Sequence, residues 1–322
     1  MKKLLFLVLL VGMSFGIAAC SGDDDQVIAL MISNRSNEFF SVLENAFVDK
    51  AEELGYTVEV YDAANDATKQ PSQVESAIAK GVKAIVINPL NKDATKNVLN
   101  DAIRQGIPVI TVDTSVEGVE LLAEVATDNE DGGQFAAEWL VSESGLLASE
   151  LSGIIHMKGI DGHTAHISRY AGFNNYLTGT EVSQEWKALA TNSETYIELT
   201  GNFAQDEAQS AFESKLSALD PSGKYVVYAE NDVMAIGVVQ AIENDSRFDI
   251  ANFTIIGFDG SSDGKELVDS GKMAVTVVQD FEFIGQKAAM IVDDYFTNNV
   301  ELDDPVVAVE VVMYPEEENP RN

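Results

Sequence analysis

Residues 81–115 read GVKAIVINPLNKDATKNVLNDAIRQGIPVITVDTS and contain two short runs of β-branched and apolar residues, 84–87 and 108–112. Between the runs lies a polar turn, followed by a segment with apolar residues at helical spacing. A strand, a helix and a second strand in this order are typical of a βαβ unit with parallel strands. The second run ends directly on Asp113.

The stretch GKYVVYAENDVMAIGVVQAIENDSRFDIANFTIIGFDGS (223–261) repeats this order of strand, turn, helix, strand and aspartate. Further strands are expected at 27–33, 57–62, 121–125, 153–157, 274–278 and 305–312, with helices between most of them. One sheet of so many strands would be unusual. We therefore predict an α/β fold of two doubly wound parallel-sheet lobes.

The two lobes have no long linker between them, so short crossings should join them. We place these crossings at Thr127–Asp128, Gln279–Asp280 and Leu302–Asp304. The first lobe would then comprise residues 26–127 and 280–303, and the second lobe residues 128–279 and 304–322.

The first twenty residues resemble a bacterial lipoprotein signal. Lys2 and Lys3 precede an apolar stretch over 4–15 that is too short to span a bilayer, and small residues then lead to Cys20. The resemblance implies a signal peptide over 1–19, a lipid on Cys20 and a short tether over 20–25. The mature protein would be extracytoplasmic, lipid-anchored to a membrane in the periplasm or at the cell surface. An ordinary signal peptide with an incidental cysteine is the alternative.

The charge balance argues against some classes of partner. The 322 residues include 53 acidic and 20 basic side chains, a formal net charge of -33. Nucleic acid and anionic membrane surfaces would repel such a chain, because clustered Lys and Arg are needed to neutralise phosphates. A solvated acidic surface is the simplest explanation of this charge.

Enzymatic motifs are weak. The turn after the first strand, Ser33 to Asn37, lacks the glycines of a dinucleotide-binding fingerprint. Residues 260–264 (GSSDG) fit the spelling of a nucleophile elbow, but no histidine follows them in the chain. His163 and His166 have no third ligand at a clear spacing, so no metal and no cofactor are predicted.

Polar side chains follow the predicted strands. They are Ser33, Asn88, Asp113, Asn231, Asp259 and Gln279. Ligands of open parallel sheets bind outside the carboxyl ends of the strands, so these groups should converge. Carboxylates accept hydrogen bonds and amides both donate and accept, which suits an uncharged polyol. Taken singly, each residue could equally be a turn or helix cap.

Aromatic rings could cover the apolar faces of a sugar. Phe39 or Phe40 could supply a ring from the first lobe and Phe203 one from the second. Phe40 fits the apolar stripe of the predicted helix after Asn37, so placement in the core is expected more of Phe40 than of Phe39.

Seven segments, in order, resemble the periplasmic ribose-, galactose- and related sugar-binding proteins: VIALMISNRSNEFF (27–40), KAIVINPL (83–90), IPVITVD (107–113), TDNEDGG (127–133), YAENDVMAIG (228–237), IIGFDG (255–260) and AVTVVQ (274–279). The resemblance implies two lobes joined by three crossings, with a sugar trapped between them. It places Ser33, Asn37, Phe39, Phe40 and Asp113 in one wall of the site. It places Phe203, Asn231, Asp259 and Gln279 in the other.

The chain also departs from the ribose-binding pattern. Thr114 and Ile167 stand where ribose binders have arginines, and His163 resembles the histidine of galactose binders. Arg169 would be either a ligand residue or the structural arginine of the family, buried against a carbonyl or an acid. The ligand expected from the resemblance is a monosaccharide or related polyol, such as a hexose, a deoxy-sugar or a cyclic polyol.

The implied function is that of a monomeric substrate-binding protein that delivers a sugar to the permease of an ABC transporter, without catalysis. The alternative is a ligand-presenting protein that docks on a chemoreceptor or a sensor kinase. Lobe closure would serve either role, because any partner that recognises the closed form detects the ligand.

Overall fold

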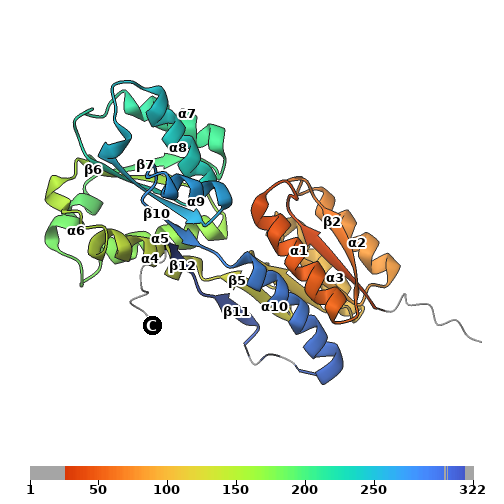
Figure 1. Cartoon of the computed structure of the whole chain (residues 1–322). Helices are drawn as coiled ribbons and strands as arrows, with labels where there is room; N and C mark the ends of the chain where they lie inside the picture. Colours follow the sequence, from red (N-terminus) through yellow and green to blue (C-terminus); the bar gives the residue numbers. More distant parts are fainter. Residues whose placement is uncertain (1–25, 301, 303, 316–322) are drawn as a thin grey trace, which may run out of the picture.

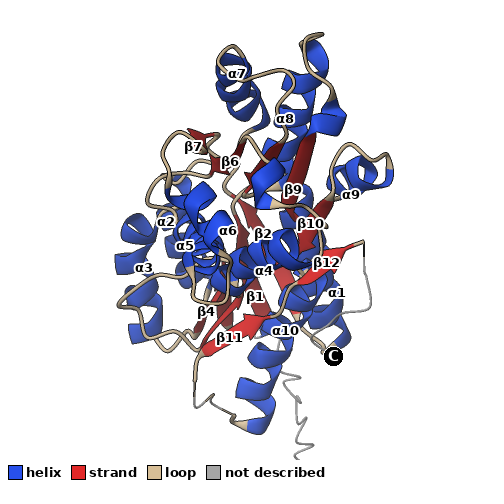
Figure 2. Cartoon of the chain, turned by 90° about the vertical axis from the view of Figure 1, so that its left-hand side faces the viewer, coloured by secondary structure: helices blue, strands red, loops and turns tan. Residues whose placement is uncertain are grey.

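The computed structural model describes residues 26–300, 302 and 304–315. Cys20 and the rest of the predicted signal and tether lie outside these residues. The chain forms two lobes side by side, each built on a six-stranded sheet with helices on both faces (Figures 1 and 2). This is the predicted α/β class of two doubly wound sheets.

The first sheet has the order β11-β5-β4-β3-β1-β2, and all of its strand pairs are parallel. Its strands are β1 (Val27–Ile32), β2 (Thr57–Asp62), β3 (Ala84–Ile87), β4 (Val109–Val112), β5 (Ala123–Thr127) and β11 (Val306–Val309).

The second sheet has the order β12-β10-β9-β8-β6-β7 and is parallel except for the pair β10 and β12. Its strands are β6 (Gly153–Lys158), β7 (Tyr196–Thr200), β8 (Tyr225–Ala229), β9 (Phe253–Asp259), β10 (Val275–Val278) and β12 (Val312–Tyr314).

The α-helices are α1 (Glu38–Glu53), α2 (Lys69–Lys80), α3 (Lys92–Arg104), α4 (Asn129–Ser142), α5 (Thr164–Thr178), α6 (Gln184–Thr191), α7 (Gln205–Leu216), α8 (Asp232–Asn244), α9 (Ser262–Asp269) and α10 (Phe281–Asp293). Shorter turns are η2 (Ala148–Glu150), η3 (Ile250–Asn252) and the π-helical η4 (Asp294–Asn298). Within the described residues, no helix is long and apolar enough to cross a membrane.

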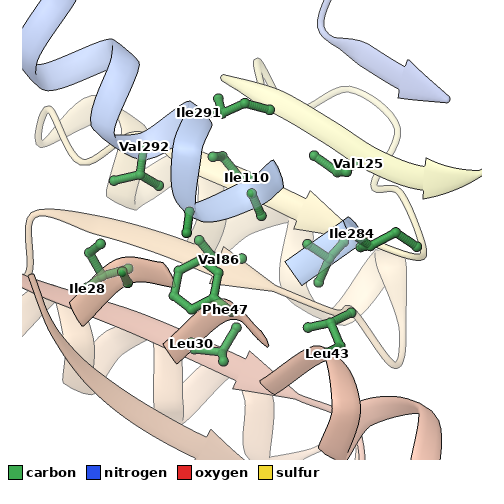
Figure 3. Close-up of a cluster of buried hydrophobic side chains, with 14 of the residues drawn as sticks. Ile28, Leu30, Leu43, Phe47, Val86, Ile110, Val125, Ile284, Ile291 and Val292 are labelled. Atoms are coloured by element: carbon green, nitrogen blue, oxygen red, sulfur yellow. The ribbon is translucent and has the colours of Figure 1, made fainter. Parts of the chain in front are cut away.

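The core of the first lobe follows from the alternation of side chains along its strands. Ile28, Leu30 and Ile32 of β1 point to the face covered by α1 and α10, where they meet residues such as Leu43 and Ile284 (Figure 3). Ala29 and Met31 point to the opposite face, covered by α2 and α3. With both faces of the sheet buried, its central strands β1, β3 and β4 are nearly continuous apolar runs.

The second lobe is built in the same way. One face of its sheet packs against α4, α5 and α6, and the other against α7, α8 and α9. Along β8, Val226 and Tyr228 belong to the first of these cores, and Val227 and Ala229 to the second. The two lobes therefore have separate cores, and their relative motion need not disrupt either.

The chain crosses between the lobes after β5, after β10 and between β11 and β12. The third crossing differs from the prediction. The expected strand over 305–312 is split: β11 pairs with β5 in the first sheet, whereas β12 pairs with β10 in the second. The crossing thus lies at residues 310–311, and β11 belongs to the first lobe. The prediction at Leu302–Asp304 was wrong because a continuous β-branched run does not reveal which sheet each half joins.

The prediction also missed β7, an edge strand whose side chains are mostly part-exposed. An edge strand with one solvated side lacks the continuous apolar run by which the central strands were found.

Candidate functional site

The carboxyl ends of the two sheets face each other across a cavity of about 440 Å³. Every residue predicted for the site lines this one cavity: Ser33, Asn37, Phe39, Phe40, Asp113 and Thr114 from the first lobe, and His163, Arg169, Phe203, Asn231, Asp259 and Gln279 from the second. A cavity of this size accommodates a single small ligand.

The first wall is organised by Asn88, which follows β3. Its amide nitrogen donates to Asp113 Oδ2 at 3.0 Å and to Thr114 Oγ1 at 2.8 Å, and its amide oxygen accepts from the Ser33 hydroxyl. Ser33 and Thr114 are almost fully buried, whereas Asp113 faces the cavity. Asp113 is therefore the group of this set that is placed to accept hydrogen bonds from a ligand.

Asp113 and Asp259 both have a raised pKa. Burial raises the pKa of Asp113 from 3.8 to about 6, although the charge of Arg169 and the hydrogen bond from Asn88 act in the opposite sense. Burial also raises the pKa of Asp259, to about 7, against the effect of the Arg169 charge. Two carboxylates that lose water in this way gain from hydroxyl donors.

Three predicted site residues are helix N-caps, which determines the groups that they offer. Asn37 Oδ1 accepts from Phe39 N–H at 3.0 Å, and Asn231 Oδ1 accepts from Met234 N–H at 2.9 Å. Because the carbonyl oxygen of each side chain caps a helix, its NH₂ group is the part available to a ligand. Both residues therefore cap helices and also line the cavity.

His163 is the third cap, and its Nδ1 accepts from Ala165 N–H at 3.3 Å. Burial and the nearby Arg169 charge lower the pKa of His163 from 6.5 to about 4, so the ring is neutral at pH 7. A neutral imidazole that accepts at Nδ1 carries its proton on Nε2. His163 is thus a hydrogen-bond donor at the cavity.

Gln279 and Arg169 surround Asp259. Gln279 Nε2 donates to Asp259 Oδ1 at 2.6 Å, while Gln279 Oε1 is buried without a hydrogen-bond partner. Arg169 Nη1 lies 3.6 Å from Asp259 Oδ1 and donates to the carbonyl oxygen of Glu230 at 2.5 Å. Its guanidinium lies over the Phe258 ring at 3.7 Å. Arg169 is therefore buried against both a carbonyl and an acid while it lines the cavity.

Aromatic rings stand on both sides of the cavity. Phe39 contacts Phe40 edge-on at 4.6 Å and Phe281 at 3.8 Å between ring centroids. Phe39 is the more buried of the pair and joins the core of the first lobe, whereas Phe40 is partly exposed. The expectation that a core position suits Phe40 more than Phe39 was wrong, because Phe281 of the distant α10 packs on Phe39.

Phe203 provides the ring on the opposite side. It lies directly on the backbone of Gly159, where a Cβ atom would come within 2.1 Å of Phe203 Cζ, and it meets His163 edge-on at 5.4 Å. Only glycine at position 159 permits this approach.

Backbone strain concentrates at the cavity. Residues other than glycine with positive φ include Asn65, Asp113, Asn202, Phe203 and Asp259, and all five line the cavity. For Phe203, with a φ of 56°, this conformation costs on the order of 1–3 kcal/mol. Strain of this kind collects at functional sites, where the surrounding structure imposes it.

A second, wider opening of about 730 Å³ shares six lining residues with the cavity: Asn37, Phe39, Asn65, Phe203, Asp259 and Gln279. At its edge the lobes are joined. The carboxylate of Glu38, the first residue of α1, accepts from Ser262 N–H at 3.1 Å and from Ser262 Oγ at 2.5 Å. Since Ser262 begins α9 in the other lobe, the carboxylate also interacts favourably with the N-terminus of that helix.

Sequence reasoning named Asn88 among the converging strand-end residues, but it did not assign six other lining residues to the site: Asn65, Pro89, Leu90, Ile160, Ala165 and Asn202. Ala64-Asn65 could have been recognised as a turn after β2. For Ile160 and Leu90, apolar residues in loops, the sequence offers no such signal.

The structure describes no group of three or more His, Cys, Asp or Glu side chains that could hold a metal ion in residues 26–300, 302 and 304–315. The elbow-like segment over 260–264 is a helix start, in which Ser261 Oγ accepts from Gly264 N–H at 3.1 Å.

A family model described as "Periplasmic binding protein domain" matches residues 28–299. The chain belongs to this family. The ribose import binding protein RbsB of Escherichia coli (strain K12) is 31% identical over 294 residues, which cover 91% of this chain and 92% of the relative. A D-apiose import binding protein of Actinobacillus succinogenes is 28% identical and covers 89% of this chain.

Solved structures of periplasmic binding proteins agree with the fold. An ABC transporter solute-binding protein from Bacillus halodurans with bound myo-inositol superposes with a TM-score of 0.75 at 25% identity, over 91% of this chain and 96% of that chain. The relatives extend over both lobes, so the similarity includes both walls of the cavity.

Proposed function

We propose that the protein binds a monosaccharide or a cyclic polyol between its two lobes and delivers it to the permease of an ABC importer outside the cytoplasm. The observation that carries this proposal is the set of side chains that the two walls present to one cavity. Donors and acceptors converge from both lobes, and aromatic rings stand on either side.

The hydrogen-bonding groups suit hydroxyls. Asp113, Asp259 and the unpartnered Oε1 of Gln279 accept, whereas the amides of Asn37 and Asn231 and the imidazole of His163 donate. A hydroxyl both donates and accepts, so a polyol can satisfy both sets. The Phe40 and Phe203 rings would lie against its C–H faces.

Closure of the lobes is favourable only when a ligand occupies the cavity. Polar groups that closure removes from water cost on the order of 1–3 kcal/mol each unless the ligand satisfies them. Micromolar binding requires about −8 kcal/mol, which lies within the ceiling for a ligand of about ten heavy atoms. The three crossings after β5, after β10 and between β11 and β12 would act as the hinge.

The relatives support the direction of transport. They are named as import binding proteins for ribose and D-apiose, and a structural neighbour holds myo-inositol. We extend this role to the present protein. Separately, the signal-like sequence before Cys20 supports a lipid anchor on that residue, which would keep the protein at the membrane beside the permease.

A thermal-shift screen of the purified protein against pentoses, hexoses, inositols and nucleosides tests the proposal. A ligand at one hundred times its Kd should stabilise the protein by about 2.7 kcal/mol, which raises the Tm measurably. Stabilisation by a sugar or cyclitol supports the proposal. No stabilisation by any polyol at millimolar concentration, or turnover of a substrate, would refute it.

A further inference from the structure

A buried carboxylate lies directly behind the second wall of the cavity. Glu230 follows β8, precedes Asn231 and has no exposed side-chain surface. Its Oε1 lies 2.8 Å from His156 Nε2, and its Oε2 accepts from Gly159 N–H at 2.8 Å and lies 2.8 Å from His166 Nδ1. The carboxylate therefore joins β6, the loop after β6, and α5.

The hydrogen bonds to Glu230 determine the charge of its carboxyl group. Burial on its own would raise the pKa of Glu230, but the hydrogen bonds from His156 and His166 outweigh it and lower the pKa to about 2. An ionised carboxylate only accepts, so the facing nitrogens of both histidines carry protons. The other nitrogen of His156, Nδ1, then accepts from the Tyr196 hydroxyl at 2.6 Å.

Stability alone is a weak explanation for this cluster. A buried ionised group loses its hydration, and well-packed apolar residues in place of buried ion pairs are often neutral or stabilising. The carboxylate holds the backbone N–H of Gly159 in one position, which an apolar side chain could not do.

That position determines where the Phe203 ring lies. The ring rests on the Gly159 backbone, and its own backbone is held in the left-handed region, next to Asn202 in the same region. Gly201 N–H donates to Lys158 O at 2.9 Å, so the Phe203 loop is also attached to the residue before Gly159. A strained loop adopts the position that its surroundings impose.

The loop after β6, which contains Gly159, also carries His163. His163 N–H donates to Ile160 O at 3.0 Å, which closes the turn that follows Gly159 and brings the imidazole against Phe203. Arg169 Nη1 donates to the backbone carbonyl of Glu230. Residue 230 thus connects to three groups of the cavity wall: Phe203, His163 and Arg169.

We propose that Glu230 is a positioning residue for ligand binding, which fixes Gly159 through its carboxylate and thereby sets the Phe203 ring against the sugar. The inference rests on the proposed function only for the identity of the ligand. The link from Glu230 to Gly159 and Phe203 stands on the contacts above.

The first test uses the unliganded protein, so it does not depend on the proposed function. Hydrogen exchange measured by mass spectrometry on a peptide that begins several residues before Gly159 and ends at His163 reports the Gly159 amide. Exchange there should rise at least tenfold in Glu230→Met, whose side chain fills the space without accepting a hydrogen bond. Val226→Ala, a core change on the same strand, should leave it unchanged. Equal exchange in Glu230→Met and the parent protein would overturn the proposal.

The second test is a double-mutant cycle on affinity, with D-ribose, D-allose and myo-inositol as probes in calorimetry. Glu230→Met and Phe203→Ala should each weaken binding about tenfold or more, and the double variant should bind no more than about threefold more weakly than Phe203→Ala alone. If the two losses in affinity multiply in the double variant, Glu230 acts independently of Phe203 and the proposal is overturned. For the control pair Val226→Ala and Phe203→Ala, the losses in affinity should multiply.

A conservative variant provides the rescue. In Glu230→Gln, the amide oxygen can still accept from Gly159 N–H, and His156 can change tautomer to accept from the amide NH₂. We expect its affinity within about threefold of the parent protein. If Glu230→Met does not fold, Glu230→Ala takes its place in both tests. If none of the probes binds the parent protein, the proposed function fails while the exchange test still decides the role of Glu230.

Discussion

Replacing Asp113 by asparagine should stabilise the empty protein at neutral pH while it weakens ligand binding. Burial raises the pKa of Asp113 from 3.8 to about 6, so the folded state holds a proton that the unfolded state has lost between these pH values. The free energy of unfolding therefore falls as pH rises through this interval, and the full cost is present above pH 6. Asparagine carries no such cost.

The magnitude follows from the pKa shift. About two pKa units correspond to an upper limit of about 3 kcal/mol. Since the carboxylate still faces the open cavity, part of this cost is screened, and we expect Asp113→Asn to be more stable by about 1–2 kcal/mol at pH 7.5. At pH 4.5 the parent residue is protonated in the folded state, and the difference should fall to about 0.5 kcal/mol or less.

Urea unfolding of both proteins at pH 7.5 and pH 4.5, followed by circular dichroism, measures this difference. Asp66→Asn is the matched control, because hydrogen bonds from Thr68 lower the pKa of Asp66 and no gain is expected there. A stability difference that is the same at both pH values would refute the reasoning. The affinity of Asp113→Asn for its sugar should fall about tenfold or more, because a charged acceptor is lost.

Three further outcomes are expected. Gly159→Ala should displace the Phe203 ring and weaken sugar binding at least tenfold in calorimetry, and unchanged affinity would show that the ring is not a contact. Glu38→Ala removes both hydrogen bonds to Ser262, so the unliganded protein should show a larger radius of gyration in small-angle scattering. The affinity of this variant for the sugar should be severalfold weaker. Scattering identical to that of the parent protein would contradict a role of Glu38 in closing the lobes. Burial lowers the pKa of His163 to about 4, so the parent protein loses stability as pH falls below 6.5. His163→Asn keeps a helix cap but has no such titration, so its free energy of unfolding relative to the parent protein should be about 1–2 kcal/mol higher at pH 5 than at pH 8. An equal difference at both pH values would count against a neutral imidazole.

The sequence was sufficient for the positions of the wall residues, for a physical reason. In a parallel sheet, every strand ends at the same edge, so a polar residue after each strand is brought to one place whatever the details of packing. Asp113 and Asp259 were found in this way. Both follow buried apolar runs that are easy to recognise.

Other features depended on contacts between segments far apart in the chain. The split of residues 305–312 into β11 and β12 reflects pairing with β5 and β10, which no local pattern reveals. The burial of Phe39 depends on Phe281, and the role of Glu230 depends on His156 and His166. Such partners are brought together only by the complete fold.

Calorimetric titration of the sugar found in the screen into the parent protein, Asp113→Ala and Asn231→Ala tests the central claim most directly. These residues belong to opposite walls, and a ligand held between the lobes contacts both. We predict one site per chain and a loss of at least tenfold in affinity for each variant. Full affinity in either variant would show that the sugar does not bind between these two walls.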